Sequence, residues 1–112
     1  MKKFLSLALS VLMLLSLLAG CGALDGREAT SNKRALDWVT SCGEKVLWRG
    51  QARWVADGKF YTSSGVSAGM DMALGFVADR FGRERAAEIA RQIEYRWNDD
   101  PDDDPFSENS RR

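Results

Sequence analysis

The sequence has no histidine among its 112 residues, and only two cysteines and two prolines. Without an imidazole the chain has no Ser-His-Asp triad, no Cys-His pair and no histidine-ligated metal. Sixteen basic residues balance sixteen acidic ones, so no binding to nucleic acid is expected. A chain of this length forms one small domain at most.

The N-terminus has the three parts of a secretory signal. Lys2 and Lys3 give a positive start, residues 4–18 form an uncharged apolar core, and small residues follow at 19–20. The uncharged stretch ends at Gly20, at the short limit of the roughly 17–25 residues that span a bilayer. The pattern therefore predicts a signal peptide over residues 1–20 rather than a permanent transmembrane helix.

The end of this segment, Leu18-Ala19-Gly20-Cys21, resembles the lipobox of bacterial lipoproteins. In that pattern the chain is cut before the cysteine and a diacylglyceryl group is attached to its sulfur. The resemblance implies lipidation of Cys21 and anchoring of the protein to a membrane of the cell envelope, on the periplasmic side. The alternative is a buried apolar helix in a cytoplasmic protein.

Cys42 is the only other thiol in the chain. With Cys21 lipidated, Cys42 has no partner for an intrachain disulfide, so a disulfide-stabilised scaffold is excluded. We expect Cys42 to be a small, partly buried residue near the end of a helix.

The body of the chain alternates helical and β-rich segments. The apolar spacing over 33–42 predicts a short helix, with Ser31 or Asn32 as its N-cap and Gly43 as its end. The apolar run 46–48 is consistent with a strand.

A β-hairpin is predicted next. The β-rich runs 53–55 and 60–62 flank Asp57-Gly58, a dipeptide typical of two-residue hairpin turns.

Two helices are predicted after the hairpin. The first covers 67–81, with Ser67 as N-cap and Gly82 as its end, and its apolar residues on most sides predict that it is buried. The second covers roughly 84–97 and has one apolar face.

The C-terminal tail carries alternating aspartates, Asp100, Asp102 and Asp104. An EF-hand calcium loop beginning at Asp100 needs glycine and glutamate where this chain has Pro105 and Arg111. No metal site is therefore expected, and the tail is predicted to be an ordered turn as far as residue 106.

Several stretches resemble the ThiJ/PfpI family, a branch of the class I glutamine-amidotransferase-like proteins. The first is LDGREATSNK, followed by ALDWV; the second and longest is ARWVADGKFYTSSGVSAGMDMAL; the third is IEYRW, followed by DPF. They begin at residues 24, 35, 52, 93 and 104, and the match as a whole covers about residues 22–106, nearly all of the chain after residue 21. They correspond only to the C-terminal part of a family domain.

The resemblance implies an α/β fold, the C-terminal portion of a flavodoxin-like sandwich. We expect an incomplete parallel sheet, a β-hairpin and two C-terminal helices. The expected organisation is a signal peptide over 1–20, a partial ThiJ/PfpI-like domain over 21–106 and a disordered tail over 107–112.

Family members act as isonitrile hydratases, amidases or glyoxalase-type enzymes, and the resemblance implies that ancestry here. They use a cysteine on a strand-to-helix elbow and an acidic residue from an early strand. Here the early strand is absent, and an ungapped match puts Leu12 at the nucleophile position and Leu14 at the elbow glycine. Asn32 stands where many members have a histidine. Leucine cannot act as a nucleophile, so no catalytic residue and no cofactor are expected.

The resemblance leaves pocket-lining residues: Asn32, Ser64, Gly65, Val66 and Ser67. The loop 64–67 precedes a predicted helix N-terminus, where backbone N–H groups bind anions. The alternative is that the loop is an ordinary strand-to-helix turn without a ligand.

Three hypotheses follow for the whole chain. It is an inactive part of an enzyme domain, completed by a second copy or by a complementing chain that covers the open sheet and the apolar helix. Alternatively, it is a lipid-anchored periplasmic binding or structural module. The third hypothesis is a decayed gene.

Overall fold

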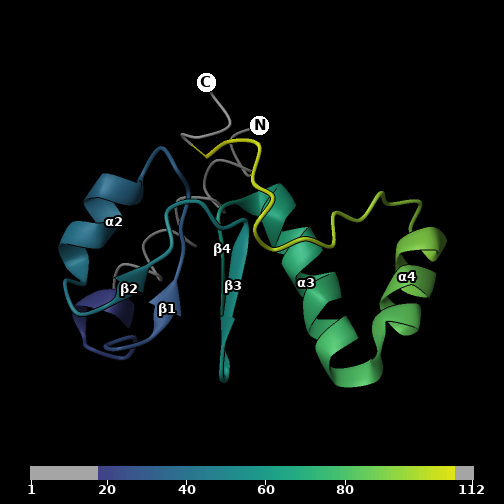
Figure 1. Ribbon diagram of the computed structural model, residues 1–112, viewed down its shortest axis with the longest axis horizontal. Coiled ribbons are helices and arrows are strands. Elements are labelled where there is room, and N and C mark those ends of the chain that lie inside the picture. The colour runs from purple at the N-terminus through teal and green to yellow at the C-terminus, as the bar shows by residue number, and fades with distance from the viewer. Residues whose placement is uncertain (1–17, 108–112) are drawn as a thin grey trace.

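The computed structural model describes residues 18–107 and shows a mixed α/β domain (Figure 1). Its elements, in chain order, are β1 (Glu28–Ala29), α2 (Leu36–Cys42), β2 (Leu47–Trp48), β3 (Trp54–Asp57), β4 (Phe60–Ser63), α3 (Val66–Phe81) and α4 (Arg83–Gln92). Most of the predicted signal peptide, residues 1–17, and the end of the predicted tail, residues 108–112, lie outside the described residues.

The strands of the described region form two separate two-stranded sheets. β1 and β2 pair in parallel, with Glu28 opposite Leu47, and α2 provides the crossover that a parallel pair requires. The two-residue strand β1 was not predicted. The hairpin does not join this pair, so the parallel sheet is limited here to β1 and β2.

The predicted hairpin is confirmed. β3 and β4 pair antiparallel and end at the pair Asp57–Phe60. Gly58 has a φ of 59°, in the left-handed region that a tight hairpin turn uses and that glycine adopts at little cost.

Helix α2 ends at Gly43 as predicted, but the predicted start at residue 33 is wrong. The side-chain Oδ1 of Asn32 accepts a hydrogen bond from the backbone N–H of Arg34 (2.9 Å), which forms a local turn before the helix. This turn keeps residues 33–35 out of the helix. The N-cap is Ala35, without a side-chain hydrogen bond, so the caps predicted at Ser31 or Asn32 are also wrong.

Helix α3 confirms the predicted end at Gly82, whose φ is 94°. The predicted N-cap, Ser67, is wrong, because the helix begins one residue earlier, with Gly65 as N-cap. Ser67 lies in the first turn instead.

Helix α4 is shorter than the predicted 84–97, because it ends at Gln92. Glu94 has a φ of 54°, and the backbone N–H of Tyr95 donates to the carbonyl of Ala90 (2.8 Å). The chain reverses here, and Trp97 leaves the helix and donates through its Nε1 to the carbonyl of Asp71 on α3 (3.1 Å).

The apolar core has two parts. A small cluster beside the parallel strands contains Ala19, Leu24, Ala29 and Val46, with Trp48 and Phe60 packed against it. On the other side of the hairpin, Gly75 of α3 lies against the indole of Trp54, where a Cβ at residue 75 would be 3.2 Å from the ring. This close approach explains how α3 packs on the hairpin.

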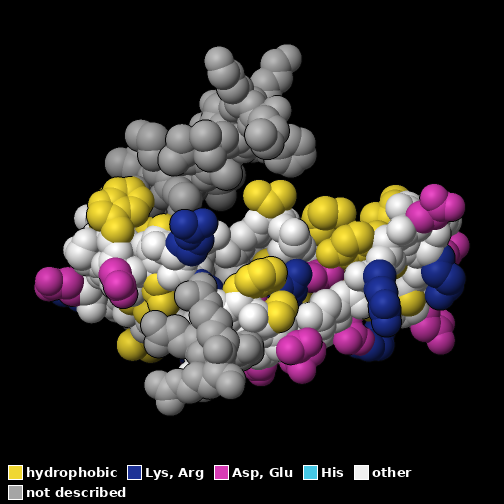
Figure 2. Space-filling model, turned by 90° about the horizontal axis from the view of Figure 1, so that it is seen from above, with side chains coloured by type: hydrophobic (Ala, Val, Ile, Leu, Met, Phe, Trp, Pro, Cys, Tyr) yellow, Lys and Arg dark blue, Asp and Glu magenta, His cyan; other side chains and the backbone are white. Residues whose placement is uncertain are grey.

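Helix α3 is not buried on most sides, and this prediction is wrong. Its buried residues are Ala68, Asp71, Leu74 and Gly75, whereas its exposed large apolar residues are Val66, Met70, Phe76 and Phe81. Figure 2 shows hydrophobic side chains at the surface over the part of the molecule that contains α3 and α4. One face of the helix packs on the domain and the other faces solvent.

The segment after α4 is ordered and runs back across the top of α3 to the hairpin (Figure 1). The carbonyl of Pro101 accepts hydrogen bonds from the backbone N–H groups of Arg53 (2.6 Å) and Trp54 (3.3 Å). Turns continue through residue 106, as predicted, and Ser107 is buried. The returning segment therefore satisfies backbone groups at the start of β3.

Candidate functional site

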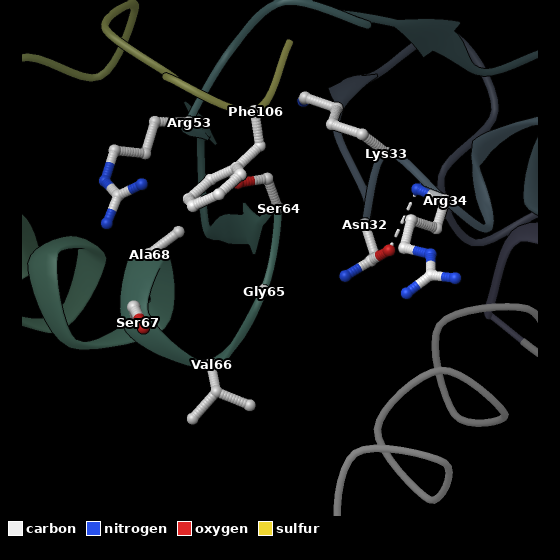
Figure 3. Close-up of a pocket in the computed structure, with 10 residues that line it drawn as sticks. All are labelled: Asn32, Lys33, Arg34, Arg53, Ser64, Gly65, Val66, Ser67, Ala68 and Phe106. Atoms are coloured by element: carbon white, nitrogen blue, oxygen red, sulfur yellow. Dashed lines mark hydrogen bonds between the residues drawn. The ribbon is translucent and has the colours of Figure 1, made fainter.

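A cavity of about 270 Å³ lies between the turn before α2, the β4–α3 loop and the C-terminal segment (Figure 3). The described residues that line it are Asn32, Lys33, Arg34, Arg53, Ser64, Gly65, Val66, Ser67, Ala68 and Phe106. The structure thus brings together all five of the pocket residues that the sequence suggested. They come from segments more than thirty residues apart.

On one side of the cavity, the local turn fixes Asn32. Because its Oδ1 accepts the N–H of Arg34, its amide nitrogen faces the β4–α3 loop, as Figure 3 shows. That nitrogen is 3.7 Å from the point where a side chain at Gly65 would begin. Arg34 is exposed beside it and makes no ion pair with any residue between 18 and 107. This side therefore presents hydrogen-bond donors and one positive charge.

The opposite side is the N-terminus of α3. The first backbone bond of this helix runs from Gly69 to the carbonyl of Gly65, which leaves the N–H groups of Val66 and Ser67 outside the helical ladder. Ser64, just before the helix, is 8% exposed, yet its hydroxyl makes no hydrogen bond within the described part of the chain. Figure 3 shows this hydroxyl directed toward Phe106, another lining residue.

A buried group of charges supports the cavity from behind. Arg53 Nε donates to Asp71 Oδ2 (2.9 Å), and Arg53 Nη1 lies 3.7 Å from Asp104 Oδ1. Lys33 Nζ lies 3.4 Å from Asp104 Oδ2 and donates to the carbonyl of Ala52 (2.6 Å). Two cations and two carboxylates thus neutralise one another below the cavity.

Burial affects the ammonium group of Lys33. Its side chain is only 6% exposed, and this burial lowers the pKa of its ammonium below the usual 10.5. The attraction to Asp104 acts in the opposite direction but is the smaller effect.

Asp71 connects the charge group to the returning segment. Besides Arg53, its carboxylate accepts hydrogen bonds from the Tyr95 hydroxyl (2.9 Å) and from the backbone N–H of Asn98 (3.0 Å). Burial, and then the hydrogen bond to Asp71, raise the pKa of Tyr95. One carboxylate on α3 therefore holds together the hairpin, the helix and the segment that carries Phe106.

Sequence reasoning missed five residues of the cavity wall: Lys33, Arg34, Arg53, Ala68 and Phe106. The signal that could have found Asp104, behind this wall, was the alternating aspartate pattern. That pattern was considered only for calcium, but Asp104 is instead the counterion of two buried cations. The described residues contain no group of three or more potential metal ligands.

Both cysteines lie away from this cavity wall. Cys21 is exposed, and its thiol donates to the carbonyl of Leu18 (3.4 Å). Ala19, two residues earlier, is 2% exposed in the apolar core. Cys42 is half-buried at the last position of α2, as predicted. None of the helices in the described region is both long and apolar enough to cross a bilayer.

No protein-family model and no curated protein matches this chain.

Proposed function

We propose that this protein is a non-catalytic binding module whose cavity at the N-terminus of α3 holds a small anion. The observation that carries the proposal is Ser64, a residue only 8% exposed whose hydroxyl lines the cavity, makes no hydrogen bond within the described residues and lies beside the free N–H groups of α3. A bound anion gives this hydroxyl the acceptor that it lacks within the described residues, and hydrogen bonds to charged groups contribute about 1.5–3 kcal/mol.

The charges around the cavity support an anion. None of the ten described lining residues is acidic, and three are basic. The dipole of a helix of 16 residues favours negative charge at its N-terminus. The Asn32 amide nitrogen and the first N–H groups of α3 supply donors from the two facing walls.

The same residues support binding without turnover. The lining residues include no cysteine or carboxylate, and the sequence contains no histidine at all. Lys33 is the remaining candidate for a general base, but its Nζ is held by Asp104 (3.4 Å) and the carbonyl of Ala52 (2.6 Å) rather than by Ser64 or Ser67.

The test is a titration of the full chain with sodium acetate, followed by the backbone amide signals of Val66 and Ser67 in ¹H–¹⁵N spectra. We expect saturable shifts in the native chain. Ser64→Ala should weaken acetate binding about tenfold, because it removes a buried charge-assisted hydrogen bond. Arg34→Gln should weaken it about fivefold, because Arg34 is exposed and partly screened.

Arg80→Gln is the matched control for charge. Arg80 lies in the last turn of the same helix, over the ring of Phe76, and should leave acetate binding unchanged. Equal weakening by Arg34→Gln and Arg80→Gln would mean that only the overall charge matters, and no saturable shift at 66–67 would remove the proposal.

We also propose that the domain descends from the C-terminal part of a ThiJ/PfpI-like, flavodoxin-type sandwich, with the hydrolase or hydratase ancestry this implies. The parallel pair β1–β2, the hairpin and the two helices after it support this origin. The exposed apolar residues of α3 are consistent with a surface that a second copy of the chain or a complementing chain covers.

The location at the membrane is a separate proposal. We infer that Cys21 carries a lipid anchor on the periplasmic side of the envelope, supported by the lipobox-like sequence and by the exposure of Cys21. Labelled palmitate should be incorporated into the native chain and not into Cys21→Ser.

A further inference from the structure

The chemistry of the cavity defines its ligand more narrowly than a small anion, and this step rests on the proposed function above. The cavity has a charged, donor-rich part and an apolar part. Each part restricts a different portion of the ligand.

The charge balance indicates a monoanion. Lys33 and Arg53 are both paired with buried carboxylates, so their charges are already compensated. Arg34 is the one cation of the cavity wall without an ion pair among residues 18–107. A single uncompensated positive charge, with the Ser64 hydroxyl and the N–H groups of α3, matches one carboxylate better than a doubly charged phosphate.

The apolar part is formed by Phe106 and Ala68, whose side chains lie near each other in Figure 3, and Val66 lines the cavity at the other end of the loop. Phe106 is 65% exposed, so its ring leaves apolar surface open to a ligand. Phe106 is held in place from behind, because its backbone N–H donates to Asp104 Oδ1 (3.1 Å), which is itself buried. The aromatic side chain is therefore presented on a fixed backbone.

The size of the cavity indicates a small ligand. Its 270 Å³ equal the volume of roughly nine water molecules in the liquid. The value lies just below the range of about 300–1,000 Å³ typical of pockets for drug-sized ligands.

We propose that the ligand is a small monocarboxylate that carries an aliphatic or aromatic group, with the carboxylate at the N-terminus of α3 and the apolar group against Phe106. The fixed Asn32 amide donates from the opposite wall. Neutral compounds of the same shape bind more weakly, because they do not use Arg34 or the helix dipole.

The experiment is isothermal titration calorimetry on the full chain with acetate, butanoate, hexanoate and phenylacetate. We expect the affinity to rise about fourfold per added methylene group until the cavity is full. Hexanamide should bind at least tenfold more weakly than hexanoate, and inorganic phosphate no more tightly than acetate.

Phe106→Ala separates the apolar contact from the anion site. Phe106 is mostly exposed, so the variant should fold, which circular dichroism checks. We expect the affinity for hexanoate to fall about tenfold relative to the affinity for acetate. Phe81→Ala is the matched control, because Phe81 is a similarly exposed phenylalanine at the far end of α3, and this variant should bind hexanoate normally.

The outcomes distinguish the two proposals. Equal affinity for acetate, hexanoate and phosphate would overturn the ligand class but leave anion binding intact. Equal affinity for hexanoate and hexanamide would overturn the carboxylate requirement. Absence of binding by every anion in the series would overturn both proposals.

Discussion

Replacement of Asp71 by asparagine is expected to destabilise the protein by about 3–5 kcal/mol. Asp71 is 1% exposed, and its carboxylate accepts hydrogen bonds from Arg53, Tyr95 and the backbone N–H of Asn98. Asparagine has nearly the same shape but no charge, so the buried guanidinium of Arg53 loses its closest counterion. Small domains have about 5–15 kcal/mol of stability in total, so this loss is a large part of it.

The measurement is urea unfolding of the full chain, followed by tryptophan fluorescence. Trp97 donates to the backbone carbonyl of Asp71, so its environment reports directly on this region. Asp79→Asn is the matched control, because Asp79 lies on the same helix, is exposed and accepts one bond from the Tyr61 hydroxyl (2.7 Å). The control should cost less than 1 kcal/mol. Similar losses in the two variants would contradict a central role for Asp71.

The elements that the sequence predicted correctly depend on local chemistry. Gly58 and Gly82 adopt positive φ angles, and Gly43 ends α2, so each glycine marks a turn or a helix end within a few residues of itself. The hairpin at Asp57-Gly58 is predictable for the same reason, since its two strands are neighbours in the chain.

The elements that were missed or misplaced depend on distant residues. β1 has only two residues, and they form a strand because Leu47 and Trp48 pair with them after a helical crossover. The end of α4 at Gln92 also involves a distant contact. Trp97 Nε1 donates a hydrogen bond to the carbonyl of Asp71 on α3, and the chain leaves the helix before it reaches Trp97. Hydrophobic periodicity alone continues past that end and extends the helix too far.

The candidate site shows the same division. The sequence places Asn32 and the loop 64–67 in one pocket only through a family resemblance. That resemblance gives no distances or orientations for these residues. Arg53 and Asp71 are 18 positions apart, and Asp104 is still further along the chain, so no spacing rule connects them. Arg53 and Asp71 meet where α3 packs on the hairpin, and Asp104 joins them because the C-terminal segment returns across α3.

Lys33→Met is expected to destabilise the protein by about 3 kcal/mol at pH 7. Methionine fills a similar volume but cannot pair with Asp104, whose side chain is fully buried. It also removes the donor to the Thr30 hydroxyl oxygen (3.1 Å) and to the carbonyl of Ala52 (2.6 Å). Lys45→Met is the control, because Lys45 is exposed and makes no ion pair within the described stretch; its cost should stay within about 0.5 kcal/mol.

The pH dependence of this difference tests how Lys33 is held. Burial lowers the pKa of Lys33 in the folded protein, so just below pH 10.5 the unfolded chain binds more protons than the folded chain. The contribution of Lys33 to stability therefore rises with pH in that window. Tyr61 and Tyr95 have pKa values raised above 10.0, so they also titrate at alkaline pH. Both tyrosines are present in the native chain and in Lys33→Met, so their effects cancel in the difference between the two.

The free energy of unfolding of the native chain should therefore exceed that of Lys33→Met by a margin that widens from pH 7 to pH 10. Urea unfolding at three pH values in this range measures the margin. A margin that narrows with rising pH would mean that attraction to Asp104 outweighs burial, so that the ammonium is favoured by its surroundings. The widening margin, in contrast, places Lys33 among the buried groups that the fold holds at a cost in order to fix Asp104 and, through it, the backbone of Phe106.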